Sequence, residues 1–168
     1  GEYRELLDGL PDGYLRCRLL FEDGAPVDCL VTEGNPALAR ILGLPIASVV
    51  GKRVTELVPD MKRMGIAWLA PCLEAARSDG AVVISRFQHA TGRWLELSVY
   101  GAGDDIRVLF HDITEHAKTS QALRRSEQRY RYLFEHSIDA VYVVSPDGNY
   151  IEANQAWLEM FRGTRQDL

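Results

Sequence analysis

The hexapeptide EGNPAL, residues 33–38, decides how this chain of 168 residues folds. Asn35 followed by Pro36 is typical of a helix start, because the Asn side chain accepts a hydrogen bond from a free backbone N–H and Pro fits the first helical turn. Leu38 and Ile41 then follow at helical spacing and predict a buried stripe. The stretch therefore predicts the point where a strand ends and a helix begins.

The same pattern returns as EANQAW, residues 152–157, an offset of 119 positions. Its surroundings return as well: residues 3–8 (YRELLD) match residues 130–135 (YRYLFE) at an offset of 127, and the Asp-Gly pair at 23–24, a hairpin signal, matches the pair at 147–148. The fall from 127 to 119 gives the first copy eight more residues, placed around its Asp-Gly turn. A period this long indicates tandem domains, the second of them truncated at the chain end.

The first copy reads as two strands, several helices and three more strands. Leu95, Leu97 and Val99 alternate with polar residues, as in a half-buried antiparallel strand. We expect an α+β fold with an antiparallel sheet and the helices grouped in mid-chain. The expected strands cover residues 16–20, 27–32, 82–88, 93–100 and 106–111; short helical pieces close at Gly43, Gly51 and Pro59; a longer helical stretch runs from 61 to 78, kinked or restarted at Pro71.

A charged segment from Thr114 to Ser137 follows the last strand, and Thr114 can cap it as a helix. Its apolar positions are spaced by three and four with interruptions. This pattern fits either a solvent-exposed connector or a weak parallel coiled coil between two subunits. The positions of this seam are Ile113, Ala117, Ser120, Leu123, Tyr130 and Leu133 or Phe134.

Composition excludes several functions. The chain has 19 Lys and Arg against 24 Asp and Glu, a net charge of -5 and a pI near 5.4, which argues against a nucleic-acid partner. Its longest apolar runs are far shorter than the roughly 20 residues of a membrane span, so we expect no membrane contact by this piece, although its parent protein could be anchored.

Cys17, Cys29 and Cys72 lack metal-ligand spacing and predict buried free thiols in a reducing cytoplasm.

Catalytic and metal sites are not expected. The four histidines, at positions 89, 111, 116 and 136, are scattered over a turn, a strand end and the charged helix, so they predict neither a catalytic triad nor a metal cluster. The Gly-Ala-Gly at 101–103 leads into a strand rather than a helix, so it reads as a hairpin turn and not as a phosphate loop.

In its order of elements the chain resembles the PAS domain family of sensory modules. The motifs that carry the resemblance are NPAL (35–38) with LGL (42–44), VGK (50–52), GRW (92–94) and above all DITE (112–115), and SEQRYRYLFE (126–135) looks like the usual lead into a following PAS domain. The resemblance implies a complete sensory domain at 1–113, a signalling helix at 114–137 and the N-terminal part of a second PAS domain at 138–168.

The resemblance also implies a five-stranded antiparallel sheet with helices on one face, homodimerisation through the terminal helices, and control of an output domain outside this chain. For a bacterial signalling protein that output would first be a diguanylate cyclase or phosphodiesterase and next a histidine kinase. The chain has no GGDEF-type loop, phosphoacceptor-His segment or ATP-binding box, so the fragment itself should not be an enzyme. The alternatives are a ligand-free structural dimerisation relay and, less favoured, a small enzyme.

A small-molecule cavity in this family lies between the long helix and the inner sheet face. The residues expected to form it are Met64, Trp68, Cys72, Phe87 and Trp94 as walls, with Arg86 and His89 as polar anchors. The alternative is a dry core with Arg86 facing water. Flavin is disfavoured because the chain has no Asn-Cys-Arg-Phe type motif, and haem because the stretch 61–78 has no His.

Signal transmission is expected at Asp112 and Thr114, where the sheet gives way to the helix. A carboxylate and a hydroxyl at that point can hold the helix start against the domain body. A change at the junction could then shift the helix between two packings.

Overall fold

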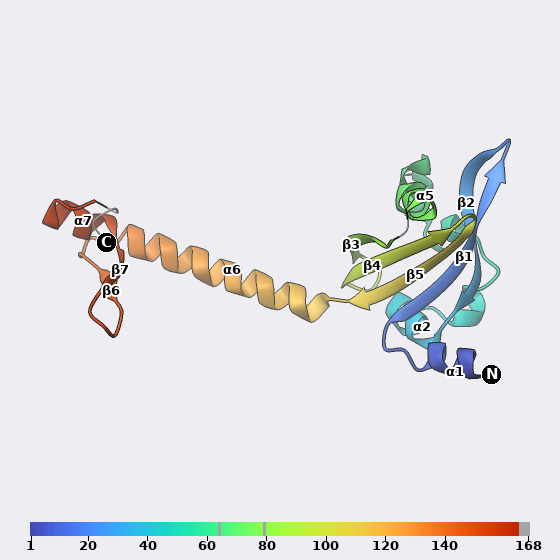
Figure 1. Cartoon of the computed structure of the whole chain (residues 1–168), viewed down its shortest axis with the longest axis horizontal. Helices are drawn as coiled ribbons and strands as arrows, with labels where there is room; N and C mark the ends of the chain where they lie inside the picture. The colour runs from blue at the N-terminus through green and yellow to red at the C-terminus, as the bar shows by residue number, and fades with distance from the viewer. Residues whose placement is uncertain (64, 79, 165–168) are drawn as a thin grey trace. The chain divides into compact units, whose positions relative to one another are not determined.

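The computed structural model describes residues 1–63, 65–78 and 80–164 and divides the chain into two compact units, Gly1–Glu115 and His116–Leu168. The first unit contains the strands and mid-chain helices expected from the sequence (Figure 1). Its elements are α1 (Glu2–Asp8), β1 (Gly13–Glu22), β2 (Ala25–Gly34), α2 (Pro36–Leu42), η1 (Ile46–Ser48), α3 (Val54–Leu57), α4 (Pro59–Arg63), η2 (Gly65–Leu69), α5 (Ala70–Arg77), β3 (Val82–Gln88), β4 (Arg93–Ala102) and β5 (Asp105–Asp112).

The five strands form one antiparallel sheet in the order β2-β1-β5-β4-β3. The predicted α+β class and five-stranded PAS-like sheet are therefore confirmed. The β1–β2 hairpin turns at Asp23 and Gly24, both with positive φ (51° and 77°), a conformation that Gly tolerates because it has no Cβ.

One face of the sheet carries the hydrophobic core. Opposed pairs such as Leu15 with Val108 and Val99 with Val108 point to this inner face, where the mid-chain helices cover them. Leu38 and Leu69 contribute fully buried side chains from the helical layer. Burial of this apolar surface supplies the main driving force for folding.

Helix and sheet approach each other very closely at Gly101 on β4. A Cβ built on Gly101 would stand 2.5 Å from the backbone nitrogen of Ala76 and 2.7 Å from the carbonyl carbon of Ala75. Only a glycine therefore lets α5 lie directly on β4.

The helical stretch predicted at 61–78, kinked or restarted at Pro71, does restart there. It is divided into α4, η2 and α5, and Pro71 lies in the first turn of α5, where its missing N–H costs no helical hydrogen bond. Gly65, a poor helix former, begins the 3₁₀ segment. Pro59 follows the C-cap of α3 and begins α4, so it closes one helix, as predicted, and starts the next.

The second group of elements consists of α6 (Thr114–Glu135), β6 (Tyr142–Val144), β7 (Tyr150–Ala153) and α7 (Gln155–Phe161). β6 and β7 form an antiparallel hairpin. The hydroxyl of Tyr130 on α6 donates to a carboxylate oxygen of Glu152 on β7 at 3.3 Å, so the hairpin contacts the end of α6. No helix in the described part of the chain is long and apolar enough to cross a bilayer.

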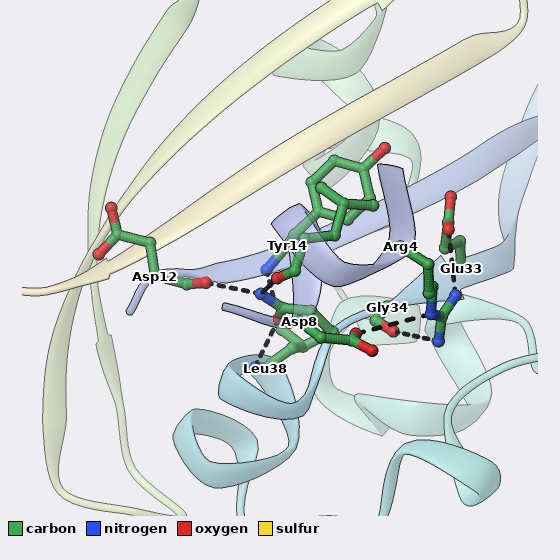
Figure 2. A network of polar contacts seen from close by, with 9 residues as sticks. Arg4, Asp8, Asp12, Tyr14, Glu33, Gly34 and Leu38 are labelled. Atoms are coloured by element: carbon green, nitrogen blue, oxygen red, sulfur yellow. Dashed lines mark hydrogen bonds and ion pairs between the residues drawn. The ribbon is translucent and has the colours of Figure 1, made fainter. Parts of the chain in front are cut away.

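Asn35 joins four segments of the first unit through its buried side chain, which is 1% exposed. Its Oδ1 accepts hydrogen bonds from the N–H groups of Leu38 (2.9 Å) and Tyr14 (2.8 Å). Its Nδ2 donates to the carbonyl oxygens of Asp12 and Leu7, both at 2.9 Å. Figure 2 shows Asp12, Tyr14 and Leu38 converging in this network from the start of β1 and from α2.

Asn154 makes three matching bonds in the second unit. Its Oδ1 accepts from the N–H groups of Trp157 (3.0 Å) and Val141 (2.9 Å), and its Nδ2 donates to the carbonyl oxygen of Asp139 (2.8 Å). Asn154 lies 13 positions after Val141, whereas Asn35 lies 21 positions after Tyr14. This difference is the eight residues by which the sequence predicted the first hairpin to be longer.

Candidate functional site

The candidate site is the junction between the end of β5 and the start of α6. The β4–β5 register places Leu95 opposite Asp112, and the N–H of Ile113 donates to the carbonyl oxygen of Trp94 at 2.9 Å. α6 begins one residue later, at Thr114. The sheet ladder therefore continues up to the first residue of the helix.

Asp112 connects this first helical residue to the sheet. Its Oδ1 accepts from the backbone N–H (3.0 Å) and the hydroxyl (2.5 Å) of Thr114, while its Oδ2 forms an ion pair with Arg93 at 2.5 Å. The N–H of Trp94 in turn donates to the Thr114 hydroxyl at 3.0 Å. The structure thus brings Asp112 and Thr114 together, with both strands of the β4–β5 hairpin attached to the start of α6.

The charge state of Asp112 follows from these contacts. Partial burial raises the pKa of Asp112, but the hydrogen bonds from Thr114 and the Arg93 ion pair outweigh it and hold the pKa below its usual value. The carboxylate is therefore ionised at neutral pH, and it can hold Arg93 and the helix start together.

Sequence reasoning missed Arg93 as a member of this site, because the GRW motif that contains it suggests no role for the arginine. The β4–β5 register starts from the pair Ala102 and Asp105 at the turn and places Leu95 opposite Asp112. Arg93 is two residues from Leu95 along β4, so its side chain lies on the same face of the sheet as Asp112. The hairpin register was the signal that could have found it.

Three of the residues expected to line a ligand cavity, Phe87, Trp94 and His89, lie away from the helical layer. This placement corrects the prediction for these three residues. Phe87 is opposite Trp94 in the β3–β4 register, and neither shares the face of buried Leu95. Phe87 packs against Trp94 (ring centroids 5.4 Å apart) and against exposed His89 in the following turn (5.0 Å). The physical reason is strand alternation: Trp94 adjoins an inward residue and must point outward.

The other cavity candidates divide differently. Arg86 is opposite Leu95, so it shares the inner face and is half-buried. Trp68 is half-buried against the core, and Cys72 is part of it. Met64 lies outside the described residues. Of the six predicted residues that the structure describes, it therefore brings three to the helical side of the sheet.

A second ionic contact lies beside the junction, where Nδ1 of His111 is 2.7 Å from Oδ1 of Asp12. Asp12 belongs to the segment between α1 and β1, and its carbonyl oxygen is one of the acceptors of Asn35. The hydrogen bond to Asp12 raises the pKa of His111 above its usual value, although burial opposes the shift. The His111 side chain therefore links the segment before β1 to the end of β5.

This contact predicts a pH dependence. Because the folded-state pKa of His111 is raised, the stabilisation is fully present below the unfolded pKa of about 6.5 and is lost as pH rises through the folded pKa. NMR titration should show that Asp12→Asn moves the His111 pKa back toward its ordinary value, since the amide removes the negative charge but keeps the backbone carbonyl that Asn35 needs. His89 serves as an internal control, and an unchanged His111 pKa in the variant would refute the assignment.

Comparison with known proteins gives the same picture as the geometry. Residues 12–115 match the PAS domain family, and residues 128–168 match a second PAS domain model. Sporulation kinase E of Bacillus subtilis (strain 168) is 38% identical over 53 residues, which cover 32% of this chain but only 7% of that protein.

The chain is also similar to solved structures. An RNA-binding light-oxygen-voltage receptor aligns with 81% of this chain and 38% of its own, at 19% identity and a TM-score of 0.51. A domain of an HTR-like protein from Haloarcula marismortui aligns over its full length with 62% of this chain, at 18% identity and a TM-score of 0.46. With its five-stranded antiparallel sheet, its mid-chain helices and a family match over residues 12–115, the chain belongs to the PAS domain family.

Proposed function

We propose that this chain is a sensory and relay module of a bacterial signalling protein. In this proposal the first PAS domain, residues 1–113, responds to a small molecule or a partner, and the helix at 114–137 passes the response to an output domain outside the chain. Residues 138–168 form the front part of a second PAS domain. The observation that carries the proposal is the attachment of Thr114 to Asp112 and Trp94, with Arg93 bonded to the same Asp112 carboxylate.

The chemistry of the junction suits a relay. Asp112 satisfies the N–H and the hydroxyl of the first helical residue and an arginine on the neighbouring strand at the same time. A shift of β4 against β5 would break one of these bonds and leave a charged group without its partner. Two discrete arrangements are therefore favoured over a continuous deformation, as signalling elements require.

Homodimerisation through the terminal helices completes the proposal. α6 carries exposed apolar side chains at Leu123, Tyr130 and Leu133. Residues 123 and 130 are one heptad apart, so a second copy of the helix could cover them in a parallel coiled coil. A solvent-exposed connector is the alternative, and the oligomeric state of the purified chain distinguishes the two.

The output and the input are proposed from different observations. The sporulation kinase relative supports a kinase output ahead of the cyclase or phosphodiesterase expected from the sequence. On the input side, Trp68, Cys72 and Arg86 are the described residues that remain candidates for a ligand site. The fully buried Leu69, Ala75 and Ile106 fill the space between the sheet and the helices, which supports the alternative of a ligand-free relay.

The decisive variant is Asp112→Ala. We expect it to leave the first domain folded, to speed amide hydrogen exchange in the first turn of α6, and to uncouple input from output in the full-length parent protein. The loss of three hydrogen-bonding contacts to the junction is the reason.

The matched control is Asp105→Ala. Asp105 lies at the other end of β5 and is ion-paired with Arg16 (2.7 Å) and Arg107 (3.3 Å), yet it does not contact α6. The substitution at Asp105 should leave both amide hydrogen exchange in α6 and signalling unchanged. Normal signalling by Asp112→Ala, with unaltered exchange at Thr114, would disprove the proposed relay site.

A further inference from the structure

The segment before β1 is attached to the end of β5 by side chains. The β1–β5 ladder ends with the pair Gly13 and Phe110. One residue beyond this pair, the side chain of Asp12 meets that of His111, with Nδ1 of His111 2.7 Å from Oδ1 of Asp12. Asp112 directly follows His111 in the chain. The contact therefore holds the part of β5 that leads into the relay site.

The same segment is attached to α1 on its other side. The carbonyl oxygens of Asp12 and of Leu7, which lies in the last turn of α1, both accept hydrogen bonds from Nδ2 of Asn35 at 2.9 Å. The Asn35 side chain is almost fully buried, and these two bonds use both of its amide hydrogens. A series of contacts therefore runs from the end of α1 through Asn35 and Asp12 to His111.

α1 itself lies on the surface of the first unit. Its residues are exposed except for Leu7, which is half-buried, and its N-cap, Gly1, makes no side-chain capping bond. Arg4 attaches the helix to Glu33 (3.1 Å) and to the carbonyl oxygen of Gly34 (3.5 Å), as Figure 2 shows. A helix of seven residues is marginal by itself. α1 is therefore easily displaced, although its last turn is bonded to the interior.

α6 meets the second unit at the position where α1 meets the first. Residues 130–135 at the end of α6 match residues 3–8 in sequence. Tyr130 donates to Glu152, which has the position of Glu33, the residue that bonds α1 in the first unit. The helix that leaves the first domain therefore arrives at the second as α1 arrives at the first.

We propose that α1 is an input of the first domain, and that its displacement reaches the start of α6 through Asn35, Asp12 and His111. The buried amide transmits the movement rather than absorbing it, because breaking either of its bonds leaves a buried polar group without a partner. Such a module passes a movement of its incoming helix to its outgoing helix without a ligand in its core. The inference rests on the relay function proposed above, since Asp112 and Thr114 are its receiving end.

Leu6→Pro tests the inference by unwinding α1. Leu6 is 72% exposed, so no buried contact is lost, but Pro inside a helix removes a hydrogen bond and clashes with the preceding turn. We expect the amides of Ile113 and Thr114 to exchange roughly 2- to 30-fold faster by NMR, the range in which residues along a coupled network act. Leu6→Ala, which keeps the helix, should leave their exchange unchanged. The N–H of Leu19, which donates to the carbonyl oxygen of Asp104 near the other end of β5 (2.8 Å), is the internal control.

Asp12→Ala tests the route. It removes the carboxylate that contacts His111 but keeps the carbonyl oxygen that bonds Asn35. In this background we expect Leu6→Pro to have no further effect on exchange at Thr114, because the connection between α1 and β5 is already cut.

The outcomes separate this inference from the relay itself. Unchanged exchange at Thr114 in Leu6→Pro, together with faster exchange in Asp112→Ala, would overturn the inference and leave the relay site in place. If neither variant alters exchange at Thr114, both proposals fail. An equal rise at Leu19 would mean a general loosening of the sheet, and a full effect of Leu6→Pro in the Asp12→Ala background would mean another route. Either result would overturn the inference.

Discussion

Asn35→Ala should lower the free energy of unfolding of the first domain by about 4 kcal/mol, since each buried polar group left without a partner costs about 1–3 kcal/mol. The substitution leaves four backbone groups without their side-chain partner: the N–H groups of Tyr14 and Leu38 and the carbonyl oxygens of Leu7 and Asp12. Water cannot replace a side chain that is only 1% exposed without opening the structure. The helix cap of α2 and the alignment of β1 are lost together.

Urea denaturation followed by tryptophan fluorescence measures this effect. Asn35→Asp is the sharper variant, because it keeps the acceptor for both N–H groups but turns the donor toward Leu7 and Asp12 into a second acceptor. We expect it to destabilise as well. Asn154→Ala, the equivalent change in the second unit, should leave the transition of the first unit in place. A loss below about 1 kcal/mol for Asn35→Ala would show that the network is not a main support of the fold.

Gly101→Ala should cost about 2–3 kcal/mol, near the upper end of what overpacking of a core costs. The new methyl group would meet the backbone of Ala75 and Ala76 at distances no Cβ tolerates, and backbone atoms cannot turn aside as a flexible side chain can. α5 must therefore move away from β4, which loosens the packing around buried Leu69.

The matched control for this prediction is Gly80→Ala, the same chemical change at a glycine where an added Cβ would have no heavy atom within 4 Å. We expect it to change the unfolding free energy by no more than about 0.5 kcal/mol. Thermal and urea unfolding of both variants make the comparison. Equal losses for the two would mean that the contact of α5 with β4 is not tightly packed.

Much of the fold could be predicted because the deciding signals are local. An Asn before a helical stripe, an Asp-Gly between apolar runs and a strict alternation along β4 each act over a few residues. The duplicated Asn35 and Asn154 also predicted the relative lengths of the two hairpins, because a buried amide that accepts from an N–H at the matching position in both copies keeps their spacing comparable.

The candidate site was predicted only in part. Asp112 and Thr114 adjoin in sequence, so their contact could be expected, whereas Arg93 reaches Asp112 through the β4–β5 register. The same dependence on register placed Phe87 opposite Trp94 and away from Arg86. A register shift of one residue moves every side chain on a strand to the opposite face of the sheet. Such a shift changes local interactions little, but it costs much free energy in the core.

By itself, then, the sequence determined the duplication, the order of strands and helices and the caps that begin α2 and α7, because those depend on hydrogen bonds and periodicities within a few residues. Tertiary structure decided which groups meet: α5 against Gly101, and Arg93 with Asp112. Each of these contacts joins residues brought together by the packing of whole elements. Their free energy depends on that packing, which no short stretch of sequence specifies.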